Sequence, residues 1–459
     1  MLKRFIGDKR FYRHVFALML PILIQNGITN FVNMLDNLMV GSVGQIEMVG
    51  VSVTNQLIFV FNLCIFGAVS GAGIFGAQFA GSGDEKGLRD TFRFKIILSL
   101  AITAICSVLF IFWGEELINL YLKGEENTEN AALSLGFGRE YLNIMLIGFV
   151  PNALVQCYSS TLRETGKTVP PMAAGVIAVF VNLIFNYCLI FGNFGFPKLG
   201  VAGAAIATVI SRFVEFGIIS VWTGVKKESN RFIIGAFKSL RVPLSLVKSI
   251  AIKGLPLMAN ETLWAAGIAI VNQCYSERGM DVVAANNIVQ TFFNVFSVAF
   301  MAVGVAIGII LGQMLGAGKT KEAKDTSVKL TAFSLAVSVV VAVLFAICAE
   351  FIPEFYNIEP EVKELATVLM QICAVAMPLD AFAHASYFTL RSGGQAFITF
   401  VFDSGFVWVA SVPFAFALSR FTDMPIIPLY ALSQGLNLLK CIIGFIFVKR
   451  GKWIKKIVS

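Results

Sequence analysis

Long runs of apolar residues, broken only by short polar segments, make up most of the chain. Residues 168–197 and 330–349 carry no Asp, Glu, Lys or Arg, and about 20 apolar residues are enough to cross a bilayer as a helix. The pattern predicts an all-α integral membrane protein with twelve transmembrane helices. We place these near residues 14–41, 50–80, 94–115, 135–160, 168–192, 200–224, 248–276, 282–313, 328–349, 364–390, 396–420 and 427–449.

Composition and charge support this prediction and orient it in the membrane. Hydrophobic residues make up 57% of the chain and charged residues 14%, whereas soluble proteins carry about 25% charged residues. The predicted termini and even-numbered loops hold 27 of the 36 Lys and Arg residues, and such residues are enriched in cytoplasmic loops. We therefore expect a multi-pass plasma-membrane protein with both termini in the cytoplasm. The net charge of +8 then needs no nucleic-acid partner.

Two halves of the chain resemble each other at nearly constant spacing. The segment "GAQFAGSGDEKGLRDT" (76–91) matches "LGQMLGAGKTKEAKDT" (311–326) at an offset of 235, and "TLRETG" (161–166) matches "TLRSGG" (389–394) at 228. This predicts two pseudo-symmetric six-helix lobes, parallel repeats about the membrane normal, which is a transporter architecture. The predicted parts are an N-lobe (1–225), a cytoplasmic linker (226–249) and a C-lobe (250–459).

Two glycine-containing motifs resemble nucleotide-binding signatures but lack the context that these need. "GAGIFG" (71–76) fits a dinucleotide fingerprint, yet no strand precedes it. "TLRETGKT" ends like a P-loop, but Thr161 replaces its first glycine. His14 and His384 form no metal-binding motif. We therefore predict helix-packing glycines, no enzymatic activity and no cofactor. An intramembrane enzyme remains an alternative for which the sequence offers no nucleophile or metal.

Amide side chains recur on one face of several predicted helices. Four asparagines between Asn26 and Asn37 are spaced by four, three and four residues, which places them on one side of a helix. Such faces predict a water-filled cavity, because polar groups buried in lipid need partners; hydrogen bonding between helices is the alternative. Pro21 and Pro256 are expected to kink their helices. The expected substrate-cavity residues are Asn33, Asn37, Asn55, Gln290 and Asn294.

Four carboxylates lie deep within the predicted spans: Asp36, Glu261, Asp380 and Asp403. An Asp at the centre of a span costs about 2.5–3.5 kcal/mol, so each is a candidate proton carrier, cation ligand or substrate counter-charge. Buried ion pairs are the alternative, and Arg212 could pair with Glu215 on its own helix. Asp403 lies near the cytoplasmic end of its helix, where simple solvation is a further alternative.

Over essentially its whole length the chain resembles the multidrug and toxic-compound extrusion (MATE) family. The resemblance rests on Pro21 and Asp36 in the first helix, the GxQxxGxG turn of the first half with its QxxGxG counterpart in the second, and "VNLIFNYCLIFGNFGFPKLGVAGAAIATVISR" (181–212). It implies twelve helices in two lobes around a V-shaped cavity. It also implies rocker-type alternating access and antiport of organic cations against Na⁺ or H⁺.

The same resemblance assigns roles to individual residues. Asp36 matches the N-lobe carboxylate that takes the coupling ion, whether a proton or Na⁺. The residues implied near it are Asn182, Asn186, Thr208 and, through its carbonyl, Ala204. Together they would give the oxygen shell that hard cations prefer, although some family members have a second acid in place of Asn186. Glu261 and Asp380 match C-lobe coupling acids, so either lobe could carry the ion.

The expected function is therefore secondary active efflux of organic cations and xenobiotics. The nearest alternative is a flippase for a lipid-linked precursor, which resembles the same superfamily and would be expected to line its cavity with Arg and Lys. The deep charges here are mostly acidic. An ion channel is disfavoured by the two-lobe repeat with asymmetric acids. We expect a monomer whose partners are small organic cations and the lipid bilayer.

Overall fold

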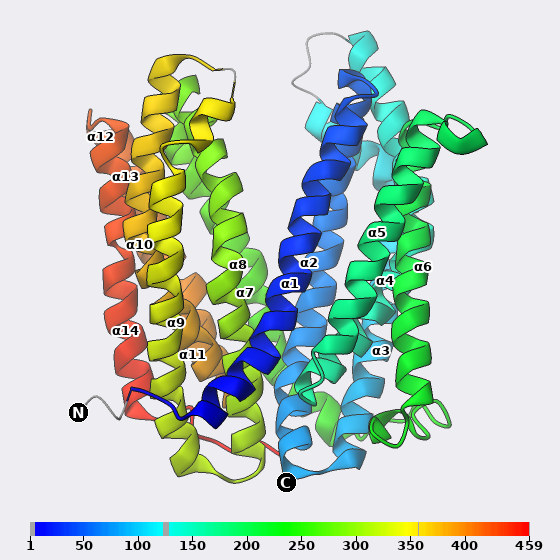
Figure 1. Cartoon of the computed structure of the whole chain (residues 1–459), viewed down its shortest axis with the longest axis vertical. Coiled ribbons are helices and arrows are strands. Elements are labelled where there is room, and N and C mark those ends of the chain that lie inside the picture. Colours follow the sequence, from blue (N-terminus) through cyan, green and yellow to red (C-terminus); the bar gives the residue numbers. More distant parts are fainter. Residues whose placement is uncertain (1–4, 123–127, 357, 459) are drawn as a thin grey trace. The chain divides into compact units, whose positions relative to one another are not determined.

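A computed structural model of the protein describes residues 5–122, 128–356 and 358–458, except for the side chains of Asn33, Met34, Asn37, Leu38 and Thr128. Within these ranges every regular element is helical, and twelve helices are long and apolar enough to cross a membrane (Figure 1). The predicted fold class is confirmed. The first six spans are α1 (Lys9–Gly41), α2 (Gln45–Ser82), α3 (Glu85–Leu122), α4 (Thr128–Glu164), α5 (Val169–Phe191) and α6 (Val201–Val225).

The second half repeats this order with one interrupted helix. Its elements are α7 (Leu244–Ser276), α8 (Met280–Gly316), α9 (Thr320–Cys348), α10 (Pro360–Ser392), α11 (Ala396–Phe400), α12 (Val412–Phe421), α13 (Ile426–Gly435) and α14 (Asn437–Arg450). Two π-helical stretches, Val401–Gly405 and Val407–Ser411, connect α11 to α12. The span that begins with α11 is therefore continuous through α12, and α13 with α14 forms the last span.

Most helices are longer than the hydrophobic pattern predicts. Hydrophobicity marks the part of a helix inside the bilayer, whereas the backbone stays helical until a turn residue ends it. For example, α3 begins at Glu85, nine residues before its predicted start at residue 94. At the other end of the neighbouring helix, α4 continues to Glu164 and is followed by Gly166 at φ 82°. These extensions bring charged residues into the helical bundle.

The chain forms two compact units. Unit 1 contains Met1–Leu23, Ala77–Gly83 and Ala251–Ser459, and unit 2 contains Ile24–Gly76 and Asp84–Ile250. Helix α1 passes from one unit to the other two residues after Pro21, which lies inside the helix. Pro256 likewise lies inside α7. The lobe boundaries that the sequence predicts, and the kinks at these prolines, remain predictions.

In unit 1 the repeated QxxGxG motif (78–83 and 313–318) marks a close helix crossing. A Cβ on Gly81 of α2 would overlap the main-chain carbonyl of Gln313 on α8. Reciprocally, a Cβ on Gly316 would overlap the main-chain carbonyl of Gln78. Only glycine leaves room for the two backbones at this distance. The repeat in the sequence is therefore a pair of reciprocal packing positions.

The C-terminal tail, residues 451–458, is hydrogen-bonded to Gln78 at the same crossing. Trp453 is 1% exposed and its indole N–H donates to the carbonyl of Val448 (3.0 Å). The buried Gln78 amide donates to the carbonyls of Ser392 (3.0 Å) and Lys455 (3.1 Å), and its oxygen accepts from the N–H of Ile457 (2.8 Å). One side chain thus satisfies main-chain groups of a tail that forms no regular helix.

Substitution of Gln78 by Leu should release this tail. Three hydrogen bonds are lost, and main-chain groups left unsatisfied cost about 1–3 kcal/mol each, which is enough to open a terminal segment locally. Trypsin should then cut after Lys452, Lys455 or Lys456 about ten times faster than in the wild-type protein. Gln56→Leu, at an exposed position of the same helix, is the control. Equal cleavage in both variants would show that Gln78 does not hold the tail.

In unit 2 the segment after α6 is folded rather than extended. Phe232 is buried, and its ring packs edge-to-face against Phe92 of α3 at 5.1 Å. Arg93 donates to the carbonyls of Gly235 (2.7 Å) and Ala236 (2.8 Å). The first part of the predicted linker is thus docked onto α3.

Candidate functional site

Polar side chains from α1, α5 and α6 meet in unit 2 around Asp36. The Asn186 amide on α5 donates to Asp36 Oδ1 at 2.6 Å, and the same amide nitrogen lies 3.1 Å from Asn182 Oδ1. Asn182 and Asn186 are one helical turn apart and both buried, so they present their amides on one face of α5. The sequence-predicted neighbours of Asp36 are therefore brought together.

Helix α6 closes this cluster on its other side. The Thr208 hydroxyl donates to the carbonyl of Ala204, one turn earlier, at 3.0 Å. The Asn182 amide lies 3.2 Å from Thr208 Oγ1. Thr208 and the Ala204 carbonyl, both predicted here, thus lie one step from the carboxylate, with Asn182 between them and Asp36.

The orientation of the Asn182 amide decides what this cluster can bind. In one orientation its nitrogen donates to both oxygens of Asp36 at 3.0 Å, while its oxygen accepts from Thr208. In the other orientation its oxygen faces both carboxylate oxygens at the same distance. The first arrangement suits an ionised Asp36 with no bound cation, because both carboxylate oxygens then face amide N–H donors. The second presents three oxygens to one point, as a hard cation requires.

Tyr141 on α4 lies beside the same cluster, and no pattern in the sequence indicated it. Its side chain is 6% exposed and lies near Thr208 and Asp36. A single Tyr in an apolar span has no polar periodicity and adds no charge, so neither signal used for the other residues could identify it. The hydroxyl adds a further group that can donate or accept a hydrogen bond.

Tyr141→Phe should weaken ion-dependent transport without abolishing it. The variant loses a hydroxyl beside Thr208 and Asp36, and a hydrogen bond that this hydroxyl makes when the ion is bound would be worth about 0.5–1.5 kcal/mol. The half-saturating concentration of the coupling ion should rise about two- to tenfold, with the maximal rate nearly unchanged. The measurement is the dependence of efflux rate on ion concentration, beside Tyr121→Phe at an exposed position of α3. An unchanged half-saturation would place Tyr141 outside the site.

A small polar cavity of about 30 Å³ adjoins the cluster. Its polar lining comes from Asn62, Asn152, Thr208 and Arg212, and the Asn152 amide donates to Asn62 at 2.8 Å. This volume and four polar neighbours suit one buried water molecule. Arg212 pairs with Glu215 at 3.1 Å, as the sequence suggested, so that this acid has a counter-charge on its own helix.

The two predicted C-lobe acids lie in unit 1 with different partners. Glu261 on α7 accepts a hydrogen bond from the Tyr387 hydroxyl at 2.9 Å. The Arg391 guanidinium on α10 donates to the same hydroxyl at 3.4 Å. Asp380 accepts from the amide of Asn437 at 2.8 Å. Both acids therefore accept a hydrogen bond from an uncharged side chain, Glu261 from Tyr387 and Asp380 from Asn437.

Asp403 is not simply solvated, which the sequence had left as an alternative. Its side chain is 17% exposed and pairs with Lys440 at 2.7 Å. The amide of Asn260 donates to its other carboxylate oxygen at 2.9 Å. For Asp403 the ion-pair alternative is therefore correct.

The predicted substrate-cavity residues are distributed over both units. Asn55 belongs to unit 2 and is partly exposed, whereas Gln290 and Asn294 belong to unit 1, where Gln290 is partly exposed and Asn294 is exposed. The side chains of Asn33 and Asn37 lie outside the described residues. The structure of each unit leaves the described members of this set accessible, and their role as a cavity remains a prediction.

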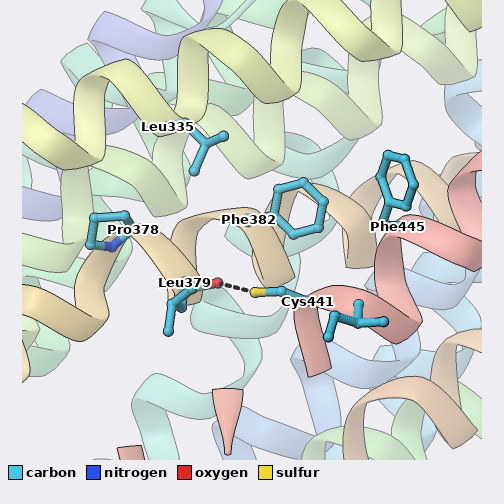
Figure 2. A pocket seen from close by; sticks show the side chains of 7 residues that line it. Leu335, Pro378, Leu379, Phe382, Cys441 and Phe445 are labelled. Carbon is cyan, nitrogen blue, oxygen red and sulfur yellow. Dashed lines mark hydrogen bonds between the residues drawn. The ribbon is translucent and has the colours of Figure 1, made fainter. Parts of the chain in front are cut away.

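An apolar cavity of about 340 Å³ lies between α9, α10 and α14 of unit 1. Figure 2 shows Leu335, Pro378, Phe382 and Phe445 around it, with the Cys441 thiol donating to the carbonyl of Leu379 at 3.2 Å. The lining contains no ionisable carboxylate or amine. This cavity is therefore unsuited to hold an ion.

The amino-acid sequence matches one family model and several curated proteins. The family model described as MatE matches residues 21–188 and 256–417. The "Probable multidrug resistance protein NorM" of Thermotoga maritima is 25% identical over 97% of this chain and 94% of its own length. The multidrug resistance protein MdtK of Pectobacterium atrosepticum is 26% identical over 89% of this chain and 87% of its own length.

A solved structure shows the same fold. It is described as the outward-facing conformation of a multidrug resistance MATE family transporter of the MOP superfamily. The match covers 100% of this chain and 99% of that chain, with a TM-score of 0.86 and 18% identity. At this identity the likeness establishes the architecture.

Proposed function

Because the chain belongs to the MatE family of membrane transporters, and is therefore a transporter rather than an enzyme, we propose that it is a multidrug efflux antiporter. It exports organic cations and xenobiotics from the cytoplasm across the plasma membrane. The inward movement of Na⁺ or H⁺ drives this export by rocker-type alternating access. Both termini face the cytoplasm in this proposal, and the functional unit is a monomer.

One observation carries the proposal: the surroundings of the Asp36 carboxylate. Two amides approach it within 3.0 Å, and in the described ranges no Lys or Arg pairs with it. A carboxylate within a transmembrane helix is costly unless it is neutralised. A proton or Na⁺ that arrives from outside supplies that neutralisation and leaves again on the other side.

The oxygen and amide groups around Asp36 suit both candidate ions. For Na⁺, the ligands would be the carboxylate, the Asn182 and Asn186 amides, Thr208 and the Ala204 carbonyl. For a proton, the amides keep the ionised form hydrogen-bonded after release. Glu261 and Asp380 are proposed as further coupling groups in unit 1.

Organic cations are the proposed substrate class because the deep acids outnumber the deep bases. A cation that binds near an ionised carboxylate favours one conformational state, and a coupling ion that neutralises the same carboxylate favours another. Exchange of the two then follows without both being bound together. Aromatic and Met side chains, abundant in this chain, accept cations of varied shape.

Reconstituted proteoliposomes with an inward Na⁺ gradient or an inward proton gradient, imposed separately, test this proposal. Efflux of a fluorescent organic cation should follow at least one gradient and stop when that gradient is collapsed. The result identifies the coupling ion at the same time. If neither gradient moves the dye while fluorescent lipid-linked sugar phosphates are translocated, the flippase alternative replaces this proposal.

A further inference from the structure

An ion pair and an amide join three helical segments of unit 1. Asp403 lies in the π-helical stretch Val401–Gly405, a geometry that often marks functional sites. Its Oδ1 accepts from Lys440 on α14 at 2.7 Å and its Oδ2 accepts from Asn260 on α7 at 2.9 Å. Both charged side chains are largely buried, with 12% exposure for Lys440 and 17% for Asp403.

Asn260 is held on its other side as well. The main-chain N–H and the hydroxyl of Ser404 donate to Asn260 Oδ1 at 3.1 and 2.8 Å. The same hydroxyl also lies 2.6 Å from the Asn260 carbonyl oxygen. Asn260 lies one turn after Pro256, and this proline removes one hydrogen bond from the preceding turn of the helix. Contacts from outside α7 therefore restrain the helix one turn beyond this interruption.

The next residue along α7 is Glu261. Its carboxylate accepts from the Tyr387 hydroxyl at 2.9 Å. Because Asn260 and Glu261 are adjacent on one helical turn, the position of one fixes the other. A change in the hydrogen bonds that Asn260 makes with Asp403 and Ser404 would therefore also move the Glu261 carboxylate.

The internal repeat shows that the contact between α7 and the segment containing Asp403 does not require charges. At the offsets of 235 and 228, Gln25 corresponds to Asn260, Asn26 to Glu261 and Gly175 to Asp403. In unit 2, the Gln25 side chain packs directly against Gly175, and Gln25 accepts a hydrogen bond from Arg163 at 2.8 Å. The acid at position 403 therefore occurs in the half that has an acid at position 261, and neither occurs in the other half.

Lys440, the basic partner of Asp403, has a basic counterpart in the other half of the chain. Lys440 corresponds to Arg212 at the offset of 228, so both halves have a cation at this position. In unit 2, however, Arg212 pairs with Glu215 on its own helix. Only in unit 1 does this cation, Lys440, pair with the residue that contacts α7, Asp403. Since a buried ion pair is weak evidence for stability alone, a role tied to Glu261 explains the pair better.

We propose that Asp403 and Lys440 are positioning residues for Glu261: through Asn260 they fix α7 one turn beyond Pro256 so that the Glu261 carboxylate faces the coupling ion. This inference rests on the proposed function, in which Glu261 takes part in ion coupling. The pair also keeps the Lys440 charge occupied, so that it does not repel an approaching cation. The other charged or titratable groups of this network are Asp380, His384, Tyr387 and Arg391, all on α10.

A double-mutant cycle in proteoliposomes tests the inference. The four proteins are wild type, Asp403→Asn, Glu261→Gln and the double variant. The measured quantities are the half-saturating concentration of the ion that drives efflux, Na⁺ or H⁺, and the maximal rate. Asp403→Asn should raise the half-saturating concentration about fivefold or more, which is typical of residues in one hydrogen-bond network, and change the maximal rate less than twofold. In the Glu261→Gln background it should add almost nothing.

Two further variants make the result decisive. Ser404→Ala loosens Asn260 without changing any charge, and it should raise the half-saturating concentration in the same direction even if Asp403→Asn folds poorly. Glu354→Gln removes an exposed ion pair with Lys363 in the same unit and should match wild type.

Three results would overturn the inference. The first is an equal effect of Asp403→Asn in both backgrounds, which would mean a role independent of Glu261. The second is wild-type ion dependence in both Asp403→Asn and Ser404→Ala. The third is wild-type ion dependence in Glu261→Gln, which removes the premise for this acid. In that case the role of Asp36 in the proposed function is still decided separately, by the variant at that position.

Discussion

Replacement of Asp36 by Asn should abolish ion-driven efflux while the protein remains folded. Asn has nearly the same shape and can still accept from the Asn186 amide that lies 2.6 Å from Asp36 Oδ1. It cannot be ionised, so it neither takes up a proton nor offers a charge to Na⁺. Removal of an uncompensated charge from a transmembrane helix should not destabilise the protein. The expected rate is that of protein-free liposomes.

The measurement compares efflux by wild type and Asp36→Asn under the gradient that drives the wild-type protein. Asp281→Asn, at an exposed position in the first turn of α8, controls for the loss of one carboxylate elsewhere. Size-exclusion chromatography confirms that the variants are folded. If Asp36→Asn transports at the wild-type rate, the ion site is elsewhere, and Glu261 and Asp380 become the principal candidates.

The sequence predicted the part of the unit 2 cluster that has a periodic or charged signature. Asp36 is an acid in an apolar run, and Asn182 and Asn186 are one turn apart on a helix. Helix geometry and the cost of polar groups in lipid identify these residues singly, whereas their grouping around Asp36 was implied by the family resemblance. The length of the apolar runs predicted the number of spans, twelve.

What the sequence did not show depends on contacts between distant segments. Tyr141 joins the Asp36 cluster from α4 without any local pattern. For Asp403 the sequence left solvation and an ion pair open, because its partners Asn260 and Lys440 lie 143 and 37 residues away along the chain. The periodicity within one helix does not show which residues of other helices it will contact. The internal repeat could have helped, since it aligns Lys440 with Arg212.

The same limitation hid a buried ion pair between α3 and α4 of unit 2. Lys95 and Glu164 lie close to the predicted span limits at residues 94 and 160, and nothing in the sequence paired them. The longer helices bring them together: Lys95 is fully buried, and its amine lies 2.6 and 2.7 Å from the two Glu164 oxygens. Gly73 and Gly76 of "GAGIFG" make room for this carboxylate. The glycines are therefore helix-packing residues, as predicted.

Breaking this pair should have the largest effect on stability of any single substitution considered. Lys95→Met leaves Glu164 buried without its cation, which costs about 3–5 kcal/mol and should lower Tm by about 5–10 °C. The repeat-related positions 330 and 392 hold Leu330 and Ser392, both buried, so the same architecture exists without the charges.

The combined variant Lys95→Leu/Glu164→Ser introduces the two residues found at those repeat-related positions. It should recover most of the loss, because replacing a whole buried pair by neutral residues is often close to neutral. Arg139→Met breaks an exposed pair in the same unit, with 61% and 51% exposure of its members, and should cost less than about 1 kcal/mol. Thermal unfolding in detergent measures all three. If the combined variant is as unstable as Lys95→Met, the loss reflects packing around these side chains, because an unpaired charge is absent from the combined variant.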